Sequence, residues 1–496
     1  MKFSALLKDL PITLSANSDP EILGITSDSR KVQKGFLFIA ETGLTVDGHH
    51  YAHKALEAGA VALLVERHLD LSIVQAVTSN TSALTGFIAS RFYQEPSQMM
   101  RMIGITGTKG KTTTTFLTHY LMSSAEKKLG LMGSVQFQVG TYQEESKYTT
   151  QPAIPLQEKL RQAVDLGASA MIMEVSSHAL AQRRAAGIDF DVAVFTNFSH
   201  DHLDFHATME DYLLAKSLLF SRLGNCDLSF KGKKYAIVNG DDPASAFIRS
   251  QCGVPVFSYG LKDGNLIQAQ QIKLFPHESQ FQLCCPEGKY EIQLPLPGRF
   301  NIYNFLAAFT VSWLEKVPIL EIIDKIKHFP GVPGRFQQIQ MGQPFQVIVD
   351  YAHTEDSLKQ ALLTAREFTS GKLRLAFGCT GDRDRSKRPV MGELAARLAD
   401  DVIITSDDPH SEDPMSIINE IRSGIPKNTT HVQYQVDRRK AIESLLNRAQ
   451  VGDTVLLAGK GHEHVQIFKD HVIPFSDVDI AKEIIDKMKF NSKEIF

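Results

Sequence analysis

The sequence predicts an α/β protein with mostly parallel sheets, divided into three domains. Short apolar runs alternate with helical patterns along most of the 496 residues, as expected for parallel sheets covered by helices on both faces. A glycine-rich strand, turn and helix start at 102–113 lies in the middle domain. The proline- and glycine-rich stretch 330–335 separates it from a further set of strands. We place the domains at 1–95, 96–335 and 336–496.

Composition indicates a soluble globular protein whose net charge does not favour binding to nucleic acid or to an anionic membrane. Hydrophobic residues make up 43% of the chain and charged residues 22%, and the net charge is −3. We therefore expect small-molecule substrates, no nucleic-acid or membrane partner, and a monomer. Five cysteines without metal-ligand spacing suit a reducing compartment. With no signal peptide and no apolar stretch of ~18 residues, we expect a cytoplasmic protein.

The first domain shows short strands around one helix. Strand-like runs lie at 22–28, 35–40 and 60–65, and a helical pattern lies at 52–59. The polar stretch 26–30 (Thr-Ser-Asp-Ser-Arg) closes the first strand and, taken alone, is typical of a loop.

The stretch 102–113 (Met-Ile-Gly-Ile-Thr-Gly-Thr-Lys-Gly-Lys-Thr-Thr) predicts a phosphate-binding loop. Gly107 and Gly110 let the backbone curl so that its N–H groups face phosphate oxygens. Lys111 can reach the outer phosphates, and the Thr112 hydroxyl can hold Mg²⁺. The predicted ATP-binding residues here are Gly104, Thr106, Gly107, Thr108, Lys109, Gly110, Lys111, Thr112 and Thr113.

This loop departs from the strict G-x-x-x-x-G-K-[ST] pattern at one position. Ile105 stands where the pattern has glycine, and Gly104 lies one place early. The apolar strand before the loop and the helix-compatible residues after it still favour a nucleoside triphosphate site over an ordinary strand–helix turn.

Two polar features follow strands of the middle domain. Glu174 lies inside the apolar strand 170–175, where a carboxylate is costly unless it is paired or bound to metal. It suits a Mg²⁺ ligand, and the alternative is a carboxylate satisfied by nearby backbone donors. His202 lies in the histidine-rich stretch 199–206, which contains no cysteine, so Mg²⁺ fits better than zinc.

The rest of the chain supplies more strands. Strands are predicted at 191–197 and 235–239, and antiparallel strands at 279–284 and 290–294. In the third domain they are predicted at 345–350, 373–377, 401–405 and 454–458. Each of these last four ends in a polar loop, at 350–354, 380–385, 406–410 and 459–463. Ligands bind at the carboxyl ends of strands in such sheets, so these loops predict a second site.

Taken together, the motifs resemble one enzyme family over nearly the whole chain. Besides the phosphate loop, they are 26–30, 174–178 (Glu-Val-Ser-Ser-His), 196–206, 215–219 (Ala-Lys-Ser-Leu-Leu), 350–354 (Asp-Tyr-Ala-His-Thr) and 459–463 (Gly-Lys-Gly-His-Glu). In this order they resemble the Mur ligases of peptidoglycan synthesis, above all those that add the third residue of the peptide.

The resemblance implies an N-terminal domain for the UDP-linked substrate, a central ATPase and a C-terminal Rossmann-like domain for the amino acid. It implies an ATP- and Mg²⁺-dependent ligase that forms an acyl phosphate and adds meso-diaminopimelate, or alternatively L-lysine, to UDP-N-acetylmuramoyl-L-alanyl-D-glutamate. Such an enzyme would serve cell-wall synthesis, cell shape and cell division.

The resemblance also implies roles for particular residues. Further ATP contacts would come from Asn301, Arg335 and Asp350. The UDP-linked substrate would contact Ser27, Ser29, Thr45, Val46, Thr149, Thr150, Ser176, Gln182 and Arg184. Metal ligands would be Thr112, Glu174, His202 and Lys216. The catalytic set would be Lys111, Lys216, His202 and Glu174.

Lys216 carries the most specific of these implications, because the family modifies this lysine to a carbamate (N6-carboxylysine). Carbamylation needs a neutral amine, and burial near a metal lowers the pKa of a lysine. From spacing alone, Lys216 would be a solvated helix lysine.

The implied amino-acid site departs from the family pattern. Its residues would be Arg383, Asp407, Asp408, Pro409, His410, Gly459 and Glu463. Diaminopimelate-adding relatives typically have Asp-Asn-Pro-Arg in this loop, whereas here Asp408 and His410 replace the asparagine and the arginine. Losing the arginine removes a bidentate partner for a distal carboxylate. We favour meso-diaminopimelate because of Arg383 and Glu463, with L-lysine as the alternative that Asp408 would suit.

Two other classes of protein are weighed against this interpretation. A folylpolyglutamate synthetase would share the central and C-terminal domain organisation but would lack a unit like residues 1–95. A P-loop GTPase would need an Asn-Lys-x-Asp guanine motif, which the chain does not contain.

Overall fold

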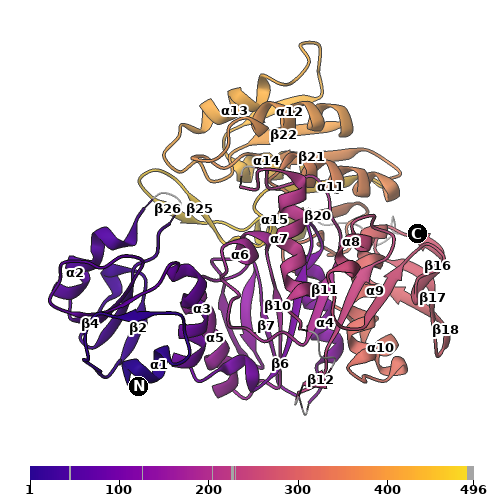
Figure 1. Cartoon of the computed structure of the whole chain (residues 1–496). Coiled ribbons are helices and arrows are strands. Elements are labelled where there is room, and N and C mark those ends of the chain that lie inside the picture. Colours follow the sequence, from indigo (N-terminus) through magenta and orange to yellow (C-terminus); the bar gives the residue numbers. More distant parts are fainter. Residues whose placement is uncertain (44–45, 126, 204, 225–227, 230, 489–496) are drawn as a thin grey trace. The chain divides into compact units, whose positions relative to one another are not determined.

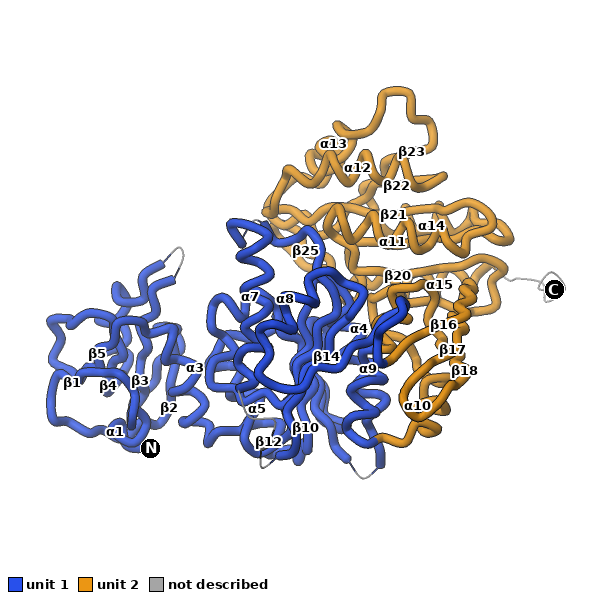
Figure 2. Tube along the Cα trace, turned by 45° about the vertical axis from the view of Figure 1, so that its right-hand side comes forward, with its two compact units in different colours: residues 1–266, 307–316 blue, residues 267–306, 317–496 orange. Residues whose placement is uncertain are grey.

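The computed structural model covers residues 1–496 and describes all of them except 44–45, 126, 204, 225–227, 230 and 489–496. The fold is α/β with mostly parallel sheets, as the sequence predicts (Figure 1). By internal contacts the chain forms two compact units (Figure 2). Unit 1 contains residues 1–266 and 307–316, and unit 2 contains residues 267–306 and 317–496.

The N-terminal sheet of unit 1 confirms the predicted strands and helix of this region. Its elements are α1 (Phe3–Leu7), β1 (Thr13–Leu14), β2 (Gly24–Thr26), η1 (Ser29–Lys31), β3 (Phe36–Ile39), η2 (Gly48–Tyr51), α2 (Ala52–Glu57), β4 (Ala60–Val65), β5 (Val74–Val77) and α3 (Thr81–Phe92). The strand order is β1-β5-β4-β3-β2. Strands β2 to β5 are parallel, and β1 pairs antiparallel with β5. Strand β5 and helix α3 were not among the predicted elements.

A second sheet in unit 1 carries the phosphate loop. The elements are η3 (Pro96–Gln98), β6 (Arg101–Thr106), α4 (Lys111–Met122), β7 (Leu129–Met132), β8 (Gln136–Val139), β9 (Tyr142–Glu145), α5 (Ala153–Asp165), β10 (Ala170–Glu174), α6 (Ser177–Ala181), β11 (Val192–Phe195), α7 (Met209–Ser221), β12 (Leu228–Ser229), β13 (Gly232–Lys233), β14 (Tyr235–Asn239), α8 (Ser245–Ser250) and β15 (Val256–Gly260). Within unit 1 the strand order is β15-β14-β11-β6-β10-β7-β8-β9.

Strand β6 lies between β10 and β11, and all three are parallel. Every residue of β10, β11 and β14 is buried, as expected for strands covered on both faces. The register pairs Glu174 with Ile105 and Phe195 with Thr106. The loops after β10 and β11 therefore flank the phosphate loop on either side.

Unit 2 begins with a strand that was not predicted, continues through the two predicted antiparallel strands and then forms a sheet of its own. Its elements are β16 (Ile267–Leu274), β17 (Ser279–Cys285), β18 (Gly288–Leu294), α10 (Ile319–Ile326), β19 (Gln337–Gln338), β20 (Gln346–Asp350), α11 (Glu355–Phe368), β21 (Leu373–Phe377), α12 (Lys387–Leu398), β22 (Asp401–Thr405), α13 (Pro414–Arg422), β23 (Val432–Gln435), α14 (Arg438–Arg448), β24 (Thr454–Ala458), β25 (Val465–Ile467), β26 (Val472–Pro474) and α15 (Asp477–Lys487). Helix α9 (Arg299–Leu314) contains residues of both units.

The larger sheet of unit 2 has the order β19-β20-β24-β21-β22-β23, and β20 to β23 are parallel along this order. Successive residues of β20 face opposite cores: Ile348 packs in the core formed with α11, α12 and α13, whereas Val347 and Val349 pack in the core formed with α14 and α15. Because β20, β24, β21 and β22 are parallel, the loops that follow them lie along one edge of the sheet.

Within the described part of the chain, no helix combines the length and the apolarity that crossing a membrane requires.

Candidate active site

The phosphate loop has the backbone that its glycines predict. Gly107 and Gly110 have φ values of +151° and +81°, in the region that favours glycine. A Cβ atom on Gly107 would overlap the Thr196 hydroxyl, so a larger residue would push the loop away from β11. Gly110 is the N-cap of α4, which begins at Lys111, so the loop leads directly into a helix N-terminus. This arrangement suits a bound phosphate.

Asn197, just after β11, holds the loop in place. Its backbone carbonyl accepts from Thr108 N at 2.8 Å, and its side-chain oxygen accepts from Lys109 N at 2.9 Å. Its amide nitrogen donates to Lys109 O at 3.0 Å. Sequence reasoning assigned no role to Asn197, and the available signal was its position at the end of the predicted strand 191–197.

Two lysine side chains share one backbone oxygen at this loop. Lys111 Nζ donates to Gly107 O at 2.9 Å and to Thr108 O at 2.8 Å. Lys216 Nζ, from α7, donates to the same Gly107 O at 2.9 Å. The predicted proximity of Lys216 to the phosphate loop is thus present in the fold.

Lys216 is not a solvated helix lysine, and that alternative is wrong. Only 1% of the residue is exposed, and Nζ lies 4.3 Å from the centroid of the Tyr212 ring. Burial lowers the pKa of the Lys216 ammonium well below its usual value, and the neighbouring Lys111 charge lowers it further. A lysine in this setting favours the neutral amine that carbamylation requires.

Glu174 ends β10 beside the start of α4. Its carboxylate accepts from Thr112 Oγ1 at 3.0 Å, from Ser134 N at 2.7 Å and from Ser134 Oγ at 3.3 Å. The residue is 1% exposed, and a Cβ atom on Gly133 would overlap Glu174 Oε1. Backbone and hydroxyl donors thus satisfy the carboxylate, as the alternative interpretation expected. The Thr112 and Glu174 oxygens are also the hard donors that Mg²⁺ prefers, so this pair fits the ion.

His202 belongs to a cluster of aromatic rings above α7. Its ring centroid lies 4.8 Å from that of His178 and 5.7 Å from that of Tyr212. The Tyr212 hydroxyl donates to Thr108 Oγ1 at 3.1 Å, which connects the cluster to the phosphate loop. His202 has a left-handed φ of +57°, and its Nδ1 lies 3.8 Å from Asp201 Oδ1. Tyr212 is a further residue that sequence reasoning missed.

The residues predicted for the substrate arm lie together. Thr150 Oγ1 donates to Glu174 O at 3.0 Å and accepts from Ser176 N at 3.1 Å. Arg184 donates to Thr150 O at 3.1 Å and to Gln182 Oε1 at 2.6 and 2.9 Å. Thr149 joins the same group, since its hydroxyl lies 2.9 Å from Ser134 Oγ. This group connects to the Glu174 end of the phosphate site through Thr150 and Ser134.

The residues predicted near the uridine lie in the N-terminal part of unit 1. In the 26–30 loop, Thr26 Oγ1 accepts from Asp28 N, and Asp28 pairs with Arg30 at 2.9 Å. Ser27 is exposed and Ser29 is half-buried on this loop, which its own internal contacts stabilise. Val46 is also exposed, and Thr45 lies outside the described residues.

The other predicted ATP contacts belong to unit 2. Asn301 is buried, and its amide donates to Pro297 O at 2.9 Å. The Arg335 guanidinium lies 4.9 Å from the centre of the Tyr351 ring. Asp350, at the end of β20, accepts from Phe336 N at 2.7 Å. Their contact with ATP stays a prediction.

Loops after the strands of unit 2 converge on Asp407. Its Oδ1 accepts from Asp408 N at 2.8 Å and from Thr380 Oγ1 at 3.3 Å. Its Oδ2 is buried without a hydrogen-bond partner, and a Cβ atom on Gly459 would overlap it. A Cβ atom on Gly381 would likewise overlap Pro409 O. Three of the four polar loops predicted to form one site therefore meet at Asp407, and the fourth, 350–354, contacts the 459–463 loop, where Gly459 N donates to Asp350 O at 3.1 Å.

The side chains that flank this centre differ in exposure. Arg383 is exposed, whereas His410 is half-buried with a left-handed φ of +50°. The His410 N–H donates to Ile467 O at 3.1 Å, which ties its loop to β25.

A buried ammonium lies among the carboxylates of this site. Oxygen atoms of Asp407, Asp408 and Glu463 lie within 4.8 Å of one another, close enough to hold a cation. Lys460 Nζ donates to Asp408 Oδ1 at 2.8 Å and to Glu463 Oε2 at 2.9 Å. Burial lowers the pKa of Lys460, but Asp407, Glu463 and Asp408 together raise it above its usual value. A lysine therefore supplies the positive charge here, and sequence reasoning missed it.

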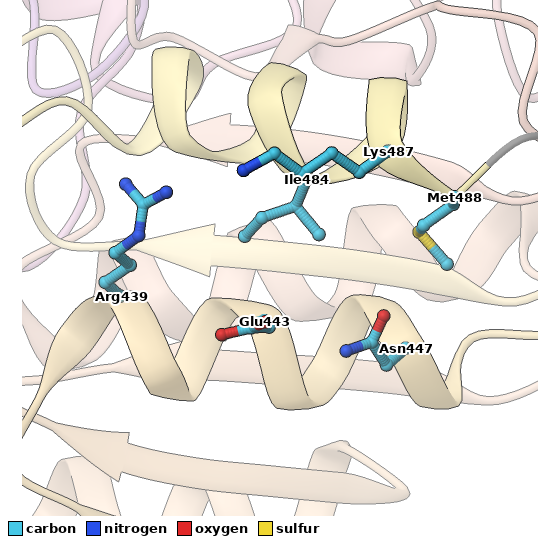
Figure 3. A pocket seen from close by; sticks show the side chains of 6 residues that line it. All are labelled: Arg439, Glu443, Asn447, Ile484, Lys487 and Met488. Atoms are coloured by element: carbon cyan, nitrogen blue, oxygen red, sulfur yellow. The ribbon is translucent and has the colours of Figure 1, made fainter.

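A separate groove lies between α14 and α15 and contains none of the predicted site residues (Figure 3). The two cationic side chains that line it, Arg439 and Lys487, pair with Glu483 at 2.6 Å each. Because the Glu483 carboxylate already pairs with both cations, we assign no site to this groove.

Family models match three successive stretches of the chain. The descriptions are "Mur ligase family, catalytic domain" for residues 21–86, "Mur ligase middle domain" for residues 105–312 and "Mur ligase, glutamate ligase domain" for residues 334–461.

Curated relatives and a solved structure match over almost the full length. A UDP-N-acetylmuramoyl-L-alanyl-D-glutamate–2,6-diaminopimelate ligase of Geobacillus thermodenitrificans is 41% identical, covering 99% of this chain and 100% of that protein. The enzyme of the same name from Syntrophomonas wolfei is 43% identical, covering 98% and 99%. A solved structure of a ligase of that name is 32% identical, with a TM-score of 0.71 over 98% of this chain and 99% of that one.

Proposed function

The chain belongs to the Mur ligase family, and we propose that it is the ATP-dependent ligase that joins meso-diaminopimelate to UDP-N-acetylmuramoyl-L-alanyl-D-glutamate in peptidoglycan synthesis. The observation that carries the proposal is the meeting of Lys111, Thr112, Glu174 and Lys216 at one phosphate loop. Family membership removes the P-loop GTPase alternative. Relatives that span the whole chain, residues 1–95 included, also argue against a folylpolyglutamate synthetase.

Three domains divide the work in this proposal. Residues 1–95 bind the UDP end of the substrate, residues 96–335 bind ATP, and residues 336–496 bind the incoming amino acid. ATP and a nucleotide-linked substrate are both cytoplasmic compounds, so we place the reaction in the cytoplasm. That the enzyme is a monomer stays a prediction from the sequence.

The reaction begins with two anions that repel each other. The substrate carboxylate attacks the γ-phosphorus of ATP, the bond to the bridging oxygen breaks, and an acyl phosphate and ADP result. The Lys111 ammonium, held over the phosphate loop, offsets this repulsion and the charge that develops on the transferred group. Arg184, oriented by Gln182, offers a guanidinium for the diphosphate or the peptide arm.

Amide formation follows. The amine of the amino acid attacks the acyl carbon, a tetrahedral intermediate forms, and phosphate leaves. His202 or a neighbouring carboxylate such as Asp201 removes the proton of the amine.

Mg²⁺ fits the oxygen donors beside the phosphate loop. Thr112, Glu174 and a carbamate on Lys216 would hold it, together with His202 in the same region, and it would neutralise phosphate charge when bound. Carbamylation of Lys216 would replace a buried amine by an anion with two further oxygen donors.

The identity of the amino acid rests on Arg383, Glu463 and the names of the relatives. Each relative described above is named as a 2,6-diaminopimelate ligase, which supports diaminopimelate over lysine for this chain. L-Lysine remains the competitor to test, because His410 replaces the arginine expected in the loop.

The decisive experiment measures phosphate release from ATP with UDP-N-acetylmuramoyl-L-alanyl-D-glutamate present. Reactions with meso-diaminopimelate, with L-lysine and without amino acid are compared, and the Lys111→Ala variant serves as the inactive control. We expect turnover that depends on diaminopimelate. Absence of amino-acid-dependent turnover would refute the ligase, and equal or faster turnover with lysine would refute the preference.

A further inference from the structure

One buried ammonium joins the loop after β22 to the loop after β24. Lys460 has no solvent exposure, and its Nζ contacts Asp408 Oδ1 in the first loop and Glu463 Oε2 in the second. Each contact is a charge-assisted hydrogen bond inside the protein, the kind that fixes geometry most strongly. The position of Glu463, a predicted amino-acid ligand, therefore depends on Lys460.

Asp408 is committed to contacts within the protein. The residue is 5% exposed, and besides Lys460 Nζ its Oδ1 accepts the Ile467 N–H at 2.9 Å. The adjoining Gln466 side chain donates to Asp407 O at 2.7 Å. Asp408 thus ties its loop to Lys460 and to β25, and its Oδ1 is committed to these internal contacts.

An asparagine at position 408 would present the same acceptor oxygen to Lys460 and to Ile467. The carboxylate found here instead of the usual amide therefore leaves the bonding pattern intact. It adds a negative charge whose partner is an internal lysine. This argues against the earlier expectation that Asp408 would suit the distal ammonium of lysine as a substrate.

We propose that Lys460 is a positioning residue for the amino-acid-binding loops, and that Asp408 is its partner and does not select which amino acid is added. This inference rests on the proposed ligase function. Lys460 acts through Asp408 and Glu463, and it needs no contact with the substrate.

The first test separates positioning from general damage. We expect Lys460→Met to raise the KM for diaminopimelate about ten- to hundredfold, the size of a lost hydrogen bond to a charged group, with the KM for ATP unchanged. Lys469→Met, at an exposed lysine of the same segment, should change neither constant. A normal KM for diaminopimelate in Lys460→Met would overturn the proposal, and so would an equal rise in the KM for ATP.

The second test uses the isosteric change at position 408. We expect Asp408→Asn to keep the wild-type ratio of kcat/KM for diaminopimelate over lysine, and Asp408→Leu to raise the KM for diaminopimelate as Lys460→Met does. A shift of about tenfold or more in that ratio for Asp408→Asn, equal to about 1.4 kcal/mol, would make Asp408 a selector and overturn the proposal.

The two Asp408 variants decide the matter even if Lys460→Met does not fold, because Asp408→Asn retains the one acceptor oxygen that Lys460 and Ile467 use. Failure of the ligase proposal is seen separately, as wild-type enzyme that releases no phosphate in response to amino acid.

Discussion

Two lysines of this protein are equally buried, yet their pKa values shift in opposite directions. Lys216 is 1% exposed and Lys460 is fully buried. Burial and the Lys111 charge lower the pKa of Lys216, whereas Asp407, Glu463 and Asp408 overcome burial and raise the pKa of Lys460. Loss of hydration is common to both, so the neighbouring charges decide the protonation state.

The difference separates two uses of the same side chain. A neutral amine is a nucleophile toward carbon dioxide, which suits Lys216 for the proposed carbamate. A permanent ammonium can hold two carboxylates at fixed positions, which suits Lys460 for its structural contacts. Neither use can be read from the amount of burial.

The largest expected effect comes from removing the reactive amine. Lys216→Ala should lower kcat by at least about 10²- to 10³-fold, the range for loss of one stabilising group in an active site, and added bicarbonate should restore little of it. Steady-state phosphate release measures this, with Lys359→Ala on the exposed side of α11 as the control. Near-normal activity of Lys216→Ala would remove Lys216 from the mechanism.

Arg438 is a third buried cation, and a fully buried carboxylate pairs with it. Arg438 pairs with Asp477 at 2.6 Å, and both are fully buried. Asp477→Ala leaves the buried Arg438 guanidinium without its carboxylate partner and should lower the free energy of unfolding by about 3–5 kcal/mol. Asp437→Ala removes the N-cap of α14 and should cost only about 1 kcal/mol. Urea unfolding of both variants measures the contrast, and equal losses would show that the buried pair has no special weight.

Glu174 is the predicted metal ligand that contacts Thr112 at the phosphate loop. Glu174→Gln keeps an oxygen for the Thr112 hydroxyl but removes the charge, so half-maximal activity should require at least about tenfold more Mg²⁺. Titration of activity against Mg²⁺ provides the measurement, and Glu145→Gln, at an exposed position, should leave the curve in place. An unchanged Mg²⁺ requirement for Glu174→Gln would argue against Glu174 as a ligand.

The smallest effect concerns stability against pH. Because the pKa of Lys216 is lowered in the folded state, the unfolded chain binds more protons at this amine, and wild-type stability rises with pH toward the usual lysine value near 10.5. Lys216→Met lacks this titration, so it should be the more stable protein at pH 7, with the gap closing as pH rises. Urea midpoints in buffer free of carbon dioxide test this. A gap that stays constant with pH would contradict the lowered pKa.

Local patterns predicted the phosphate loop and most of the parallel strands, but not β5, β7, β15 or β23. The loop at 102–113 is readable because its apolar strand, its glycines and its helix start are contiguous. Strands β20, β21, β22 and β24 are readable for the same reason, since each is a buried apolar run that ends in polar residues.

Contacts between distant segments could not be read in this way. Asn197 holds the phosphate loop only because β11 lies beside β6. The sequences of these two strands do not predict that they are neighbours in the sheet. Lys460 meets Asp408 only because β24 inserts between β20 and β21. Within Gly-Lys-Gly-His, Lys460 resembles a surface lysine of a flexible loop. The short strands β8 and β9 were missed because polar residues fill much of both.

The oxygen of Gly107 has two donors, and this bears on how a nucleotide can be received. A phosphate that attracts the Lys111 ammonium takes one donor away from this carbonyl, while the Lys216 nitrogen stays in place. A buried carbonyl left with no donor costs about 1–3 kcal/mol, which would oppose binding. Because Lys216 still donates to Gly107 O, the Lys111 ammonium can turn from this carbonyl to a phosphate oxygen without leaving the carbonyl unpaired. A carbamate on Lys216 would retain one N–H, so the exchange would survive the modification.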